Sequence, residues 1–192
     1  MPKLAQTDTA ISGAHGGVRV WDPLVRIFHW SLVASFATAW FTSSGRSDFH
    51  QWVGLVAAAL IAFRIIWGFA GPHYARFAQF IRSPRTTLTY LFDILKGHEA
   101  RYIGHNPAGG MMVLALLTAI AGTTATGWLM TTDRWYGDDT MQITHSVFAY
   151  GTVLLIVSHV SGVILASYRH KENLVKAMVT GKKKAPEAGD VG

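Results

Sequence analysis

The sequence contains no cysteine, and this absence excludes several kinds of site. Without thiolates there are no disulfides, no cysteine-ligated metals and no redox thiols. The Cys-x-x-Cys-His motif that attaches a c-type haem covalently is excluded for the same reason. Residues 1–21 lack the apolar run of a cleavable signal peptide, so we expect the first membrane helix to act as its own insertion signal.

Charge is also scarce: charged residues make up 15% of the chain, whereas half of its residues are hydrophobic. The formal net charge of +6 could suggest a nucleic-acid partner. However, the basic residues do not gather on one polar domain but lie between apolar segments. This distribution is typical of an integral membrane protein, and we expect no nucleic-acid partner.

Four apolar segments are long enough to cross a bilayer as helices. They are predicted at about 23–41, 49–69, 107–130 and 143–167. The expected fold class is all-α, an integral membrane four-helix bundle within residues 19–171. The apolar stripe of Pro84 to Lys96 predicts a helix lying on the membrane surface, and a second short amphipathic helix is expected between Tyr168 and Gly181.

The charge of the loops predicts the orientation of the bundle. Lys and Arg are frequent in the N-terminal flank, in the loop before residue 107 and in the C-terminal tail, but not in the other two loops. Both termini are therefore predicted to be cytoplasmic. Residues 1–18 are expected to form a flexible tail, and residues 172–192 a basic tail with a disordered end.

Histidines inside the apolar segments are the main indication of function. His145 and His159 lie on one face of the fourth segment, fourteen residues and roughly 21 Å apart. With the predicted orientation, His29 and His159 form a cytoplasmic-side pair, and His50 and His145 an outer-side pair. A histidine in a membrane span is costly and is typical of a functional site. The alternative is that each ring only forms a hydrogen bond with a neighbouring helix.

Two histidine pairs at two depths favour iron bound in haem. Zinc or copper normally requires further protein ligands, and no carboxylate or thiolate lies at these depths. A haem needs only two axial histidines, which leave the iron no open position, so electron transfer is the expected chemistry. Gly54, one turn after His50, leaves room for a flat ring. Arg26 and Arg64 could pair with haem propionates or could instead extend toward the lipid headgroups.

Four motifs follow one another along the chain: WDPLVRIFHW, FHQWVGLVAAALIAFRIIWGFAG, YIGHNPAGG and THSVFAYGTVLLIVSH. In order, depth and loop length they resemble the bacterial cytochrome b561 and nickel-hydrogenase cytochrome b family, over residues 18–171. The resemblance implies a multi-pass protein of the bacterial inner membrane that binds two b-type haems and oxidises or reduces quinone.

The resemblance also assigns roles to particular histidines. His29, His50, His145 and His159 match the haem-ligand positions of the family. The fourth helix is then expected to serve both haems, with His145 opposite His50 and His159 opposite His29. His105, in the Gly-His-Asn-Pro motif, is expected to form a hydrogen bond at a haem edge or a quinone site rather than to bind iron.

Several functions remain open. The first is a dihaem cytochrome that carries electrons between the quinone pool and a redox partner, such as an outer-side c-type cytochrome or a dehydrogenase. The second is an enzyme that oxidises superoxide at the outer haem and reduces quinone, although only Arg46 and Arg134 would attract this anion there. A cytochrome b subunit of a nickel-iron hydrogenase is a third, although the sequence departs from the hydrogenase-associated members of the family, in which an extended C-terminal region is expected. The last is a non-redox bundle whose histidines respond to pH.

Overall fold

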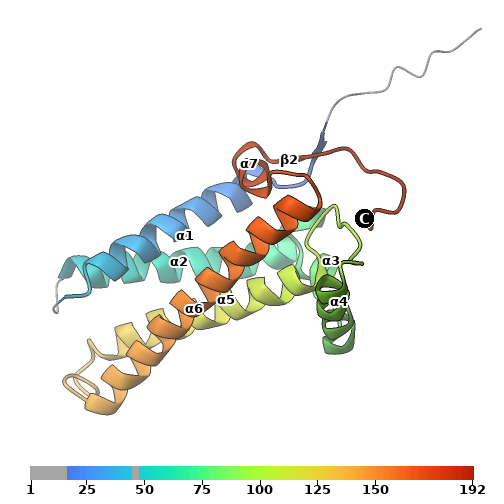
Figure 1. The fold of residues 1–192 in the computed structure, drawn as a ribbon. Coiled ribbons are helices and arrows are strands. Elements are labelled where there is room, and N and C mark those ends of the chain that lie inside the picture. The colour runs from blue at the N-terminus through green and yellow to red at the C-terminus, as the bar shows by residue number, and fades with distance from the viewer. Residues whose placement is uncertain (1–16, 45–47) are drawn as a thin grey trace, which may run out of the picture.

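The computed structural model describes residues 17–44 and 48–192 (Figure 1). The helices are α1 (Pro23–Phe41), α2 (Asp48–Ala70), η1 (His73–Ala75), α3 (Phe77–Phe80), α4 (Pro84–Lys96), α5 (Pro107–Leu129), α6 (Asp139–Arg169) and α7 (Leu174–Thr180). Two short strands, β1 (Val18–Arg19) and β2 (Lys182–Lys183), complete the fold. The predicted all-α class is confirmed. Residues 1–16 of the predicted flexible tail, and Arg46, lie outside the described residues.

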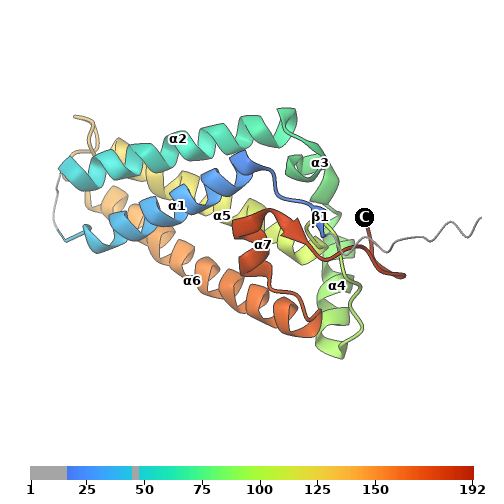
Figure 2. The ribbon, with the colours of Figure 1, turned by 90° about the horizontal axis from the view of Figure 1, so that it is seen from above.

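Four helices are long and apolar enough to cross a membrane: α1, α2, α5 and α6. They run lengthwise through the molecule, while α4 lies across one end of the bundle (Figures 1 and 2). The predicted four-helix membrane bundle is therefore confirmed. The helix predicted from Pro84 to Lys96 is present, with Ser83 as its N-cap and Gly97 in the left-handed conformation at its end.

Three of the long helices, α1, α5 and α6, begin where the sequence provides capping side chains. Asp22 accepts hydrogen bonds from the backbone of Leu24 and Val25, and Asn106 accepts one from Gly109. Such caps satisfy N–H groups that have no partner within the helix. Asp138 does the same for α6, which explains why this helix begins before the predicted residue 143. The hydropathy pattern alone missed this polar first turn.

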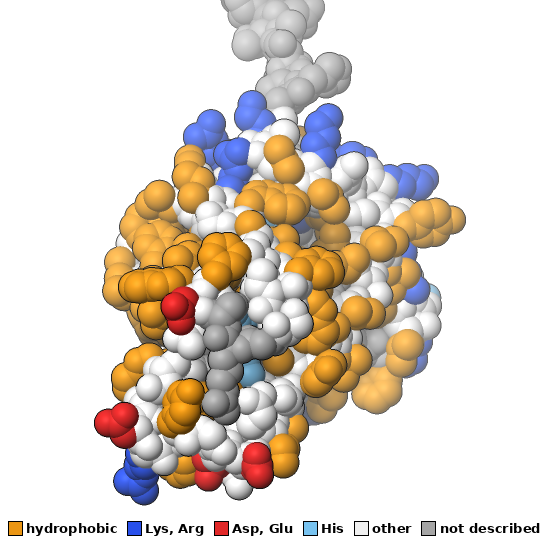
Figure 3. Space-filling view, turned by 90° about the vertical axis from the view of Figure 1, so that its left-hand side faces the viewer, with side chains coloured by type: hydrophobic (Ala, Val, Ile, Leu, Met, Phe, Trp, Pro, Cys, Tyr) orange, Lys and Arg blue, Asp and Glu red, His pale blue; other side chains and the backbone are white. Residues whose placement is uncertain are grey.

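The order of packing leaves α2 and α5 in the middle of the bundle. α1 packs against α2, α2 against α5, and α5 against α6. A core of Phe28, Ile61, Leu117 and Ile120 joins the first three of these helices. In contrast, Thr152 is the only buried residue of α6, and large apolar side chains cover the outer surface (Figure 3). An apolar exterior of this kind suits a lipid environment.

The two ends of the bundle differ in charge. One end, called the terminal end below, contains the start of α1 and the end of α6, together with residues 71–106 and 170–192. The opposite end is called the hairpin end. Figure 3 looks onto the hairpin end, where acidic side chains gather, and shows lysines and arginines along the far rim. This asymmetry is the basis for the prediction that both termini are cytoplasmic, and that orientation stays a prediction.

The C-terminal segment is folded, contrary to the predicted disordered end. β2 pairs antiparallel with β1, so that Lys183 lies opposite Val18. Farther along, Val191 accepts a hydrogen bond from the backbone of Ile103 at 2.9 Å. Residues 182–191, held in this way against β1 and the loop before α5, are called the C-terminal clasp below. The clasp covers the terminal end of the bundle.

Buried ion pairs explain why such a charged segment is folded. The Glu172 carboxylate lies 3.3 Å from the Arg101 guanidinium and 3.7 Å from the Lys183 ammonium, and Arg101 also pairs with Asp190. All four side chains are largely buried. Opposite charges can be buried when they pair with one another. A sequence pattern of consecutive lysines gives no sign of this pairing.

Candidate functional site

Two histidines face each other at the hairpin end. The rings of His50, from α2, and His145, from α6, have centres 6.4 Å apart and planes that are nearly perpendicular, at 81°. A metal between two imidazoles forms bonds of about 2 Å on each side, which places the ring centres about 6 Å apart. The spacing therefore fits one metal ion held between these two rings, as the sequence predicts for this pair.

Backbone carbonyl groups orient both rings of this pair. His50 Nδ1 lies 3.0 Å from the Ala39 carbonyl oxygen, and His145 Nδ1 lies 3.0 Å from the Thr123 carbonyl oxygen. A ring nitrogen beside a carbonyl donates its proton, so the lone pair of each ring lies on the other nitrogen, Nε2, the atom with which a neutral histidine binds a metal. A Cβ added at Gly127 would lie 3.1 Å from the ring of His145, so glycine makes room for this ring. The carbonyl partners could not be identified from side-chain types.

The terminal end holds the second histidine pair. His29 on α1 and His159 on α6 are close enough to interact electrostatically. The Nδ1 atom of His29 is buried and has no hydrogen-bond partner among the described residues. An unpartnered polar atom in a bundle interior is costly, so it is typical of a place where a further group binds. The structure thus brings together the predicted cytoplasmic-side pair.

The interior face of α2 has one empty position, at Gly54. On this face Ala57, Ile61 and Arg64 are buried against other helices. A Cβ added at Gly54 would meet no other atom within 4 Å. The interior is therefore packed along the middle of α2 and open one turn from His50. That space suits a flat ring whose metal lies between His50 and His145.

Arg64 is buried at the terminal end, with only 3% of its surface exposed. Its guanidinium lies over the ring of Phe77, at 4.9 Å, and is close enough to Asp22 to interact electrostatically. Its Nη1 atom is buried without a hydrogen-bond partner among the described residues. Arg64 therefore does not extend toward the surface, and its free donor suits an anionic group such as a haem propionate.

Arg26 has a contact that the sequence does not indicate. Its guanidinium donates a hydrogen bond to the Val179 carbonyl, in the last turn of α7. A cation is favourable there because the carbonyl groups at the end of a helix carry partial negative charge. Arg26 thus holds α7 against α1. Its Nε atom is buried and unpartnered among the described residues, so a further anion could still bind there.

His105 lies between two aromatic rings at the terminal end. Its ring centre is 4.7 Å from that of Trp21 and 4.5 Å from that of Phe80. Burial lowers the pKa of His105 to about 3, and the positive charges of Arg64 and Lys183 act in the same direction. The ring is therefore neutral at physiological pH. Its buried Nδ1 atom has no hydrogen-bond partner among the described residues and can bind a further group.

The donor set as a whole fits haem better than a bare metal ion. Within residues 17–44 and 48–192, no group of three or more His, Asp or Glu side chains could hold a metal. Haem requires only the two axial side chains that each pair provides. The open position at Gly54 suits the ring of a haem at the hairpin end, and the unpartnered guanidinium atoms of Arg64 and Arg26 suit the propionates of a haem at the terminal end.

Comparison with known proteins indicates the family of the chain. A family model described as prokaryotic cytochrome b561 matches residues 20–181. Neither the curated proteins nor the solved structures contain a match to the chain. The matched range includes both histidine pairs and His105, as well as the four helices that could cross a membrane.

Proposed function

Because the chain belongs to the prokaryotic cytochrome b561 family, whose members are membrane electron-transfer proteins, we propose that it carries electrons between quinone and a redox partner through two bis-histidine b-type haems. This is the family that the sequence motifs indicated. The observation that best supports two-ligand binding is the 6.4 Å spacing of the His50 and His145 rings. The haem number, the quinone and the partner are parts of the proposal.

Each residue of the site has a distinct role in this proposal. His50 and His145 hold the haem at the hairpin end, and His29 and His159 hold the haem at the terminal end. Haem supplies an iron that gains and loses one electron without a change of ligands. The carbonyl groups beside Nδ1 of His50 and His145 keep these rings in one tautomer and increase their basicity as ligands.

The polar groups of the terminal end have supporting roles. Arg64 provides a buried positive charge, which favours the reduced state of a nearby iron and binds propionate. His105, neutral and with a free ring nitrogen, forms a hydrogen bond with a haem edge or a quinone carbonyl. Neither role requires iron to have an open coordination position.

The charge at the hairpin end favours a protein partner over superoxide. The segment 131–142 contains three acids, Asp133, Asp138 and Asp139, and one base, Arg134, whose guanidinium lies over the ring of Trp135, 5.2 Å from its centre. A surface with more acids than bases repels the superoxide anion and attracts a basic protein surface. We therefore place oxidation of superoxide second and a basic redox protein, such as a c-type cytochrome, first.

A haem assay tests this function directly. Protein purified from haem-replete cells is expected to give a b-type pyridine haemochrome spectrum and a ratio of about two haems per chain. A ratio of about one in fully loaded protein would contradict a second ligand pair. A colourless protein would contradict electron transfer through haem and would favour a non-redox bundle.

Arg64→Leu is expected to lower the midpoint potential of one haem. The buried positive charge disfavours the oxidised iron, and its removal should lower the potential of the terminal-end haem by on the order of tens of millivolts. A redox titration followed by absorbance measures both haems, and Arg85→Leu, at an exposed position of α4, is the matched control. Unchanged potentials in Arg64→Leu would contradict its placement beside a haem.

A further inference from the structure

A cleft separate from both histidine pairs lies at the terminal end. It has a volume of about 410 Å³, within the range of about 300–1,000 Å³ that is usual for small-ligand sites. It opens to the surface where α6 ends and α7 begins. The residues that line it are apolar on one side and mostly polar on the other: Val163, Ile164, Ser167, Tyr168, Lys171, Glu172, Asn173 and Val175.

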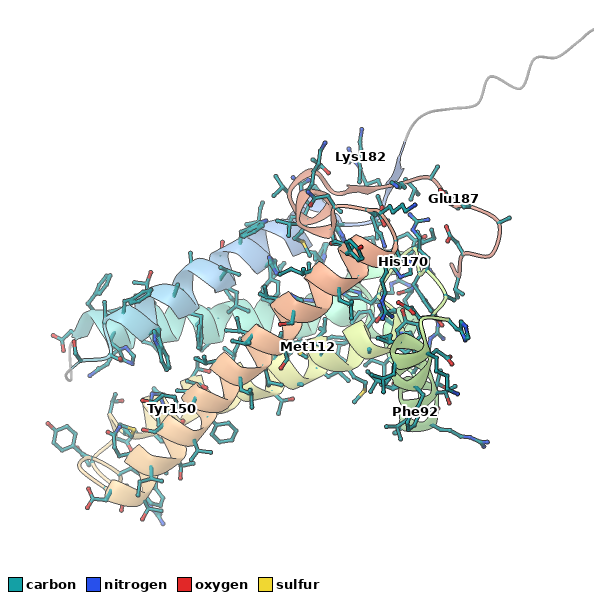
Figure 4. All side chains as sticks on the ribbon, in the orientation of Figure 1. Phe92, Met112, Tyr150, His170, Lys182 and Glu187 are labelled. Atoms are coloured by element: carbon teal, nitrogen blue, oxygen red, sulfur yellow. The ribbon has the colours of Figure 1, made fainter. Side chains whose placement is uncertain are left out.

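The cleft crosses the boundary between lipid chains and headgroups. Tyr168, 83% exposed, lies in the last turn of α6, and tyrosines at such positions are typical of the membrane interface. Val163 and Ile164 precede it and lie within the membrane-spanning helix. Lys171 and Asn173 follow it and lie beyond the end of α6; Figure 4 labels His170, the residue directly before Lys171. The cleft thus has apolar walls at chain depth and a polar mouth at headgroup depth.

The polar mouth of the cleft is positively charged. Lys171 lines it, and Lys176 is exposed on α7 directly after the lining residue Val175. Glu172 also lines the cleft, but its carboxylate is already paired with Arg101 and Lys183. The lining therefore has one unopposed cation, Lys171, and the exposed Lys176 lies on α7 one residue beyond the lining.

The backbone at Lys171 is strained. Its φ of 48° is the only positive φ of a non-glycine residue within residues 17–44 and 48–192. The left-handed conformation is unfavourable for residues with a side chain, and the ends of α4 and α7 use Gly97 and Gly181 there instead. A lysine in this position at the end of α6 provides a cation at the cost of backbone strain.

We infer that this cleft binds one anionic phospholipid. An acyl chain lies along Val163, Ile164 and Val175, and the phosphate lies at the mouth beside Lys171 and Lys176. Charge complementarity selects an anionic headgroup, since each lysine near a membrane surface strengthens binding of such lipids about five-fold. The site does not depend on haem, so it can be tested independently of the proposed electron transfer.

Native mass spectrometry of the full chain in detergent tests the site. We expect one molecule of phosphatidylglycerol to bind more tightly than phosphatidylcholine with the same acyl chains. Lys171→Gln combined with Lys176→Gln should weaken phosphatidylglycerol binding about thirty-fold and leave phosphatidylcholine unaffected. The matched control is Lys182→Gln with Lys184→Gln, an equal charge change outside the cleft. Equal binding of the two lipids, or an equal loss in both double variants, would overturn the inference.

Lys171→Gly separates lipid binding from backbone strain. Glycine relieves the left-handed conformation, so the melting temperature of the lipid-free protein should rise, while phosphatidylglycerol binding should weaken about five-fold. An increase in melting temperature with unchanged lipid binding would assign Lys171 no role in the cleft. Inorganic phosphate is the probe for a free anion. If it protected the protein from thermal unfolding as well as phosphatidylglycerol does, the site would not be a lipid site.

Discussion

Replacing His145 with alanine is expected to remove one haem and leave the other in place, so that the ratio falls from about two haems per chain to about one. His50→Ala should give the same product, because the two rings face each other 6.4 Å apart and iron between them needs both. The two variants should therefore share one low-temperature absorption spectrum and one redox titration, both belonging to the terminal-end haem.

The other pair should behave as a second, separate set. His29→Ala and His159→Ala are expected to retain only the hairpin-end haem and to resemble each other. Crossed pairing would join residues at the two depths, which are roughly 20 Å apart along α6, too far for one iron. His98→Ala, at an exposed loop position, is the control and should retain both haems. Spectra that grouped His29 with His50 would contradict the pairing.

Gly54→Leu is expected to exclude the hairpin-end haem without removing a ligand. The leucine side chain would occupy the space beside His50 in which an added Cβ meets no atom within 4 Å. Leucine favours a helix more than glycine does, so a loss of haem would not result from a weakened α2. The haem-to-protein ratio should fall toward about one, and the remaining spectrum should match that of His145→Ala.

A matched variant on the same helix tests whether the position of the added side chain matters, or whether any larger side chain on α2 would lead to a loss of haem. Ala59 lies on the exposed face of α2, opposite His50, so Ala59→Leu adds a side chain that faces away from the bundle interior. It should retain both haems. Full loading in Gly54→Leu would mean that the open position beside His50 is not where a cofactor lies.

Much of the fold was predictable because membrane helices follow local rules. Apolar length identifies each span, and Asp22-Pro23 and Asn106-Pro107 indicate where two of them begin. The positions of the histidines along these spans were enough to predict which ones share a depth. α6 extends beyond its apolar part because Asp138 caps a polar first turn, which hydropathy does not detect.

Contacts between distant parts of the chain were not predictable. Arg26 binds the end of α7, 153 residues farther along, and no periodicity relates these positions. The Nδ1 partners of His50 and His145 are backbone carbonyls, which every residue has, so side-chain identity does not distinguish them. The ion pairs of the C-terminal segment depend on Arg101 in a loop before α5. Sequence patterns describe neighbours along the chain and leave such pairings open.

The C-terminal clasp joins β1 to β2, which lie more than 160 residues apart in the sequence, so it can form only after residues 182–191 have left the ribosome. The hairpins α1–α2 and α5–α6 connect neighbouring helices and can assemble during synthesis. The order of assembly therefore follows from chain connectivity: the helices of the hairpin end pack first, and the end with His29 and His159 stays accessible until the clasp has formed. A cofactor delivered to that end has this interval in which to enter, and a chain truncated before Glu172 would never be closed there.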